Sequence, residues 1–99
     1  MDVKLYGLLV ETARHRNTIN YSDTGKGRGQ VGPLLDEINR HEHQEGRPML
    51  TVVVVHKGTT DPGPGFLQCA EDLGRFKAGE DKKAFVEAER ARVYKTWAS

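Results

Sequence analysis

The apolar residues at the start of the chain recur with the spacing of a helix. From Asp2 to about Ala13 they fall three or four positions apart and form one broad stripe, made by Val3, Leu5, Tyr6, Leu8, Leu9, Val10 and Ala13. Residues three and four apart share one face of a helix, so this spacing predicts a helix over 2–13. Arg14 and Arg16 place positive charge near its C-terminal end, where the helix dipole favours it.

A second helix is predicted over 33–45. Pro33 stands at the first helical position, where its missing N–H is no loss, and Gly46 ends the pattern. A narrow apolar stripe follows the proline at Leu34, Leu35 and Ile38. This helix is also the acidic part of the chain. Over 33–46 the only basic residue is Arg40, and the acidic residues are Asp36, Glu37, Glu42 and Glu45.

The most uniformly apolar run lies in the middle of the chain. Residues 50–55 read Leu-Thr-Val-Val-Val-Val, which is too β-branched for a stable helix and too apolar for a half-exposed strand. We therefore predict a strand over 49–55 that helices cover on both faces. A lone strand leaves backbone groups unpaired. Its partner is either the segment 18–21, where apolar and polar residues alternate, or a strand from a second copy of the chain.

Two further helices complete the predicted architecture. A short helix over 66–73 and a last helix over about 80–97 follow the strand, while glycine and proline mark loops at 22–32 and 57–65. The elements predict an α+β fold with four helices around a short sheet that contains strand 49–55. We expect a single domain over 1–99, with its core in 1–74 and a C-terminal helix at 80–97.

Length and composition narrow the class of protein. Ninety-nine residues suffice for one domain and are too few for two. A net charge of +1 excludes a strongly basic nucleic-acid coat protein and a strongly acidic nucleic-acid mimic. The chain has no apolar run near the ~20 residues that span a bilayer, no recognisable signal peptide and one cysteine, which fits a reducing compartment. We therefore expect a cytoplasmic protein with no membrane partner.

The glycine-rich run at 27–32 matches G-x-G-x-x-G and precedes a predicted helix. Such a run can hold a phosphate at a helix N-terminus, with Lys26 and Arg28 as counter-charges, or can be a flexible connection. Pro33 removes an amide that a phosphate would use, and a complete dinucleotide fold does not fit in this length. We expect Lys26 and Arg28 to project freely into solvent and to contact the phosphates of a macromolecule.

The chain shows no arrangement of residues that is typical of catalysis or of metal binding. His41 and His43 are two apart on a predicted helix and point to different faces, and HEHQE does not match H-E-x-x-H. Cys69 lies on the apolar face of a short helix, where a small buried side chain is the ordinary role of cysteine. We therefore predict no catalytic residue, no metal, no cofactor and no enzyme activity.

A set of short motifs runs from Val31 to Gly74: GPLLDEI, Glu42, GRPML, Val54-Val55, Lys57, PGPGF and AEDLG. Together they resemble a pattern of small, uncharacterised bacterial and phage proteins. The order of helix, turn, helix, strand and loop also resembles a winged-helix domain, including the DNA-binding part of alkyltransferase-like proteins. That resemblance implies phosphate contacts by Lys26, Arg28, Arg47 and Lys57. The alkyl-accepting proline-cysteine-histidine-arginine motif is absent, because Met49 follows Pro48.

We predict a non-enzymatic, winged-helix-like binding module that contacts nucleic acid through basic loops. The predicted contacts are Lys26, Arg28, Arg47 and Lys57. The alternative is a protein-interaction module, such as an accessory or inhibitor protein of a phage or bacterial defence system. In that case the acidic helix 33–45 contacts a basic partner through Glu37, Glu42 and Glu45. A homodimer, paired through strand 49–55, also stays open.

Overall fold

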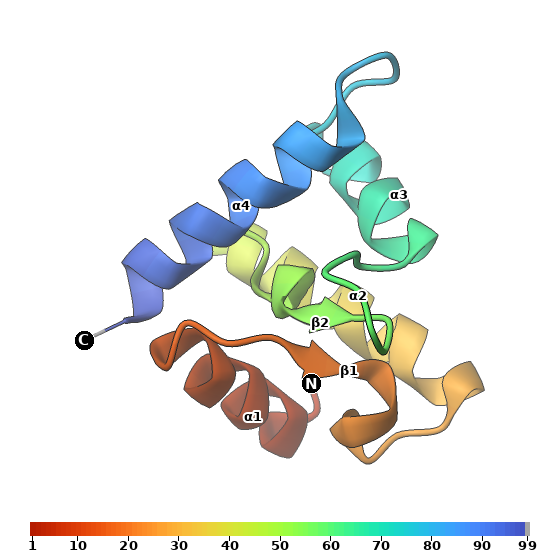
Figure 1. The fold of residues 1–99 in the computed structure, drawn as a ribbon, viewed down its shortest axis with the longest axis vertical. Helices are drawn as coiled ribbons and strands as arrows, with labels where there is room; N and C mark the ends of the chain where they lie inside the picture. The colour runs from red at the N-terminus through yellow and green to blue at the C-terminus, as the bar shows by residue number, and fades with distance from the viewer. Residues whose placement is uncertain (99) are drawn as a thin grey trace.

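Four α-helices around a small parallel sheet make up the described chain. In this computed structural model residues 1–98 are described, except for the side chain of Arg28. The elements are α1 (Val3–Arg14), β1 (Ile19–Asn20), α2 (Arg28–Gln44), β2 (Val54–Val55), α3 (Pro64–Asp72) and α4 (Lys82–Trp97). Short 3₁₀ turns follow β1 and precede β2; these are η1 (Tyr21–Thr24) and η2 (Leu50–Val53). Figure 1 shows the sheet between α1 and α4. The predicted α+β class is confirmed.

Helix α1 confirms the first predicted helix to within one residue at each end. Asp2 is its N-cap, and the Asp2 carboxylate accepts a hydrogen bond of 2.9 Å from the backbone N–H of Leu5. The buried residues of this helix are Leu5, Leu9 and Ala13. They are four apart and lie on one face, so the buried stripe is narrower than predicted, and Val3 and Leu8 are exposed.

Helix α2 begins five residues earlier than predicted, at Arg28. The loop predicted over 22–32 is therefore shorter, and Pro33 lies inside the helix rather than at its first position. Val31, Leu35 and Ile38 are all buried, and their spacing places them on one face. Each glycine in this first part of α2 disfavours a helix by about 1 kcal/mol relative to alanine. Burial of Val31 offsets that cost, so the helix begins before the proline.

The predicted strand 49–55 is wrong over most of its length. Only Val54 and Val55 pair with a strand, and the residues of η2 form a 3₁₀ turn. The expectation that helices surround this run is confirmed, because η2 is buried and packs against α1, α2 and α4. Of the two partners left open, the structure shows the segment 18–21, since Ile19 pairs with Val54 and Asn20 with Val55 in parallel register.

Polar side chains satisfy the backbone of the buried run in place of a second strand. The N–H of Met49 donates to Glu89 Oε2 at 3.0 Å, and the N–H of Thr51 donates to Asn39 Oδ1 at 3.3 Å. The carbonyl of Val52 accepts from Arg90 Nη2 at 3.2 Å. An unpaired buried backbone group is costly, so these contacts let the run be buried without an extended sheet.

The last two helices lie close to their predicted positions. Helix α3 begins two residues before the predicted segment 66–73, and α4 begins two residues after the predicted residue 80. Asp81 caps α4 by accepting from the N–H of Ala84 at 3.1 Å. Within residues 1–98, no helix combines the length and the apolar character that a membrane crossing needs.

Candidate functional site

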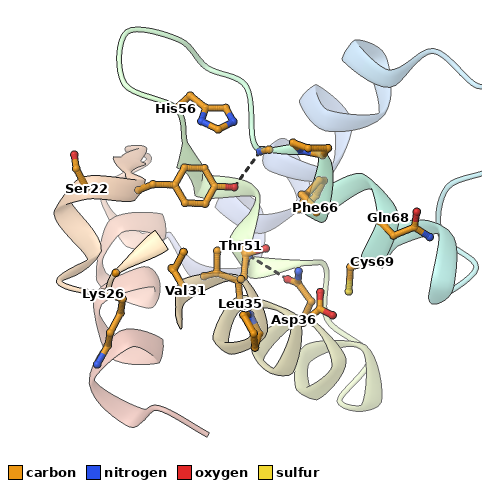
Figure 2. Close-up of a pocket in the computed structure, with 18 of the residues that line it drawn as sticks. Ser22, Lys26, Val31, Leu35, Asp36, Thr51, His56, Phe66, Gln68 and Cys69 are labelled. Carbon is orange, nitrogen blue, oxygen red and sulfur yellow. Dashed lines mark hydrogen bonds between the residues drawn. The ribbon is translucent and has the colours of Figure 1, made fainter. Parts of the chain in front are cut away.

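The two predicted loops meet at one cleft, although residues 33–56 separate them along the chain. The cleft has a volume of about 1200 Å³ and lies between η1, α2 as far as Asn39, the residues that follow β2, and α3. Figure 2 shows Lys26 at one end and Gln68 and Cys69 at the other, with His56 above them. Apolar side chains supply much of its wall; they include Val31, Leu35 and Phe66. Such a surface is suited to binding.

The cationic side chains of the cleft come from both loops. Lys57 is exposed and has no ion pair within the described residues. Lys26 Nζ lies 2.7 Å from Asp2 Oδ2, and its hydrogen bond to that carboxylate lowers the pKa of Asp2 from its usual value. The expectation that Lys26 projects freely into solvent is wrong, because the first residues of the chain supply its partner. Lys57 is therefore the more available of these two cations.

A contact between Tyr21 and Gly63 joins two walls of the cleft. The backbone N–H of Gly63 donates to Tyr21 Oη at 3.0 Å, and the rings of Tyr21 and His56 lie 5.0 Å apart at 37°. A Cβ on residue 63 would lie 3.1 Å from Tyr21 Oη and 3.2 Å from His56 Nε2. Glycine at this position thus allows η1 to approach the start of α3 closely.

Polar groups from α2 and α3 line the inner part of the cleft. Asn39 is buried and its side chain is held by Thr51, as described above. Asp36 on α2 lies beside Cys69 on α3, and Figure 2 shows the two side chains close together. Asp36 has no ion pair within residues 1–98. Burial, followed by the Asp36 carboxylate, raises the pKa of Cys69 to about 11.

Cys69 should therefore react slowly with alkylating reagents in the folded protein. At about pH 8 its thiolate fraction is about 100-fold lower than that of a cysteine with the ordinary pKa of 9.0, and the thiolate is the reactive form. We expect alkylation by iodoacetamide to accelerate about 100-fold or more in denaturant. In the folded protein the rate should still rise with pH above 9. Equal rates in the folded and unfolded protein would contradict this assignment.

Arg47 lies away from the cleft, and its side chain contacts other residues of the chain. Its Nη2 donates to Glu42 Oε2 at 2.7 Å and to Tyr6 Oη at 3.4 Å, and its guanidinium lies 5.4 Å from the centre of the Trp97 ring. The hydrogen bond to Glu42 is the main cause that raises the pKa of Arg47, and Tyr6 adds to it. Arg47 therefore leaves the predicted set of phosphate contacts. The side chain of Arg28 lies outside the described residues.

The predicted acidic contact face is smaller than expected. Glu42 is fully buried and paired with Arg47, so its prediction as a surface contact residue is wrong. Glu37 is exposed, and its carboxylate lies 2.8 Å from the N-terminal ammonium of Met1. Glu45 is exposed near the end of α2. Only Glu37 and Glu45 of the three predicted residues are thus at the surface.

Most residues of the cleft were not predicted as site residues; they include Tyr21, Asp36, His56 and Phe66. The PGPGF segment, which leads into the first residues of α3, was the one local signal, since a glycine and proline run at the start of a helix is typical of a loop that shapes a site. Within the described residues, no three His, Cys, Asp or Glu side chains are grouped to hold a metal ion. Comparisons with protein-family models, with curated protein sequences and with solved structures found no match.

Proposed function

We propose that this chain is a non-enzymatic, winged-helix-like binding module that contacts nucleic acid at the cleft. The observation that carries the proposal is the convergence of the two basic loops on one concave surface, with Lys26 and Lys57 both among its lining residues. In the proposed likeness to a winged-helix domain, α2 corresponds to the second helix of the helix-turn-helix. Residues 56–63 correspond to the wing loop. A phosphate contact by Lys57 would position the strand.

Helix ends add positive potential to the same surface. The N-caps of α2 and α3 are Gly27 and Gly63, and neither helix has a side-chain cap at that end. Both glycines line the cleft. The N-terminus of a helix carries the positive end of its dipole, which favours an anion nearby. In α3 this is a dipole effect more than a set of free donors, because Pro64 has no N–H and the N–H groups of Gly63 and Phe66 are already hydrogen-bonded. The two helix dipoles therefore add to the positive charge of Lys57 at the cleft.

The acidic charge of α2 opposes phosphate binding less than its sequence suggests. Glu42 is paired with Arg47 inside the chain, and Glu37 is paired with the ammonium of Met1. Asp72, on the facing helix α3, lies 3.8 Å from Arg40 of α2. These cations offset the negative charge of carboxylates that would otherwise repel a nucleic acid. They also leave fewer free carboxylates for a basic protein, which weakens the protein-interaction alternative.

The proposal is tested by replacing Lys57 with alanine and measuring binding to labelled DNA and RNA by fluorescence anisotropy. Between about 50 and 200 mM salt, log K falls with log [salt] by about 0.7 to 0.9 per phosphate contact. We expect Lys57→Ala to weaken binding for every sequence and to reduce this slope by one contact.

Lys95→Ala, on the exposed side of α4, is the matched control and should leave the slope unchanged. Absence of binding at low salt would overturn the proposal, as would a salt slope that Lys57→Ala does not alter. A protein partner that is captured from solution and lost on reversal of Glu37 and Glu45 to lysine would favour the protein-interaction alternative.

A further inference from the structure

We infer that the inner part of the cleft holds one unpaired base of a nucleic-acid strand, with the Asp36 carboxylate accepting hydrogen bonds from the edge of that base. The inference rests on the proposed function and names the chemical group that enters the cleft. It is carried by the position of Asp36 among the other charged side chains, and by the apolar walls around it.

The cleft is concave and needs a projecting ligand. A paired base shows its edges only within the grooves of a duplex, where a hollow surface cannot reach them. An unpaired base projects from its backbone, and proteins hold such bases between apolar or aromatic side chains while hydrogen bonding to their edges. Val31, Leu35 and Phe66 supply apolar wall from opposite sides of this cleft.

Asp36 differs from the other carboxylates near it because its oxygens are not committed to a cation. Asp72 at the cleft accepts from Gln68 Nε2 at 3.1 Å and lies near Arg40. Within the described residues Asp36 has no ion pair, and its neighbour Cys69 is a protonated thiol. A carboxylate has about four acceptor sites, so Asp36 retains free sites toward the cleft.

The charges of the cleft orient a nucleotide in one direction. A phosphate placed beside Asp36 would be repelled, whereas a phosphate beside Lys57 would be attracted. The base must therefore point toward Asp36 and the backbone must run past Lys57. The complementary partner for an ionised carboxylate is a pair of N–H donors.

Among the bases, guanine presents that pair. Its N1–H and its exocyclic N2–H lie side by side, so both can donate to the two oxygens of one carboxylate. Adenine and cytosine place a ring nitrogen acceptor beside a single amino group, and thymine and uracil flank one N–H with two carbonyls. The second carboxylate oxygen would face an acceptor in each of these cases. Asp36 thus selects guanine.

The test uses single strands of oligo-dT that differ in one central nucleotide, dG, dA, dC or dT, with binding followed by anisotropy. We expect the strand with dG to bind about tenfold more tightly than the others, as a bidentate contact to a base implies. Asp36→Asn has nearly the same shape and should abolish the preference, while plain oligo-dT should still bind and its salt slope should still depend on Lys57.

Glu37→Gln is the matched control, because it makes the same change of charge at the next position of α2, where the side chain faces Met1. It should retain the preference for dG, and thermal melts should show that both variants fold. Equal binding of the four strands, or a preference that survives Asp36→Asn, overturns this inference and leaves the proposed function intact if the effect of Lys57 holds. Absence of binding to any strand overturns both.

Discussion

Replacing Arg47 by alanine should lower the free energy of unfolding by about 3–5 kcal/mol. The reason is that the buried Glu42 carboxylate remains after the arginine is removed. Glu42 is 0% exposed, and Arg47 donates to it from Nη2 at 2.7 Å and from Nε to both carboxylate oxygens at 3.2 Å. Loss of the guanidinium leaves a charge in the interior without a cation. Urea denaturation, monitored by circular dichroism, measures the effect.

A double-mutant cycle separates this pair from simple loss of packing. Arg47→Met combined with Glu42→Gln removes both charges at similar volume, and we expect it to recover most of the lost stability. Lys83→Ala on the exposed side of α4 is a control that should change stability by no more than about 0.5 kcal/mol. If the double variant is as unstable as Arg47→Ala alone, the pair does not act as described.

The second large effect is expected at Glu89, whose replacement by alanine should cost about 3 kcal/mol of stability. Glu89 is 1% exposed and joins three separate groups: the backbone N–H of Met49 at 3.0 Å, Arg75 at 3.2 Å and Arg92 at 2.7 Å. The cost is at the lower end for a buried pair because both arginines reach solvent. The buried N–H of Met49 loses its acceptor outright.

Glu87→Ala is the control for this prediction, since residue 87 is an exposed glutamate on the same helix. It should leave the free energy of unfolding, measured in urea, within about 0.5 kcal/mol of the wild type. Glu89→Gln should lie between the two, because an amide oxygen can still accept from Met49. If Glu89→Ala lowers stability no more than Glu87→Ala does, the contacts of Glu89 contribute little to the stability of the fold.

Much of the candidate site escaped sequence reasoning for a definite reason. The two loops were predicted, and the structure places both at one cleft. A hydrogen bond from the Gly63 N–H to Tyr21 Oη links them, and nothing in the local pattern at either residue indicates that pairing. The fate of each charge was equally hidden, because Lys26 and Arg47 have the same local polarity as Lys57 but find partners inside the chain.

The amino-acid order alone determined four helices, the acidic nature of α2, the buried character of the run before β2 and the α+β class. These follow from periodicity and charge, which are properties of neighbours along the chain. Tertiary contacts decided where α2 begins, why the valine run is a 3₁₀ turn with two strand residues, and which charges remain free. Each of those outcomes depends on groups far apart in sequence, such as Glu89 meeting Met49 or Asp2 meeting Lys26, whose distances only the folded chain sets.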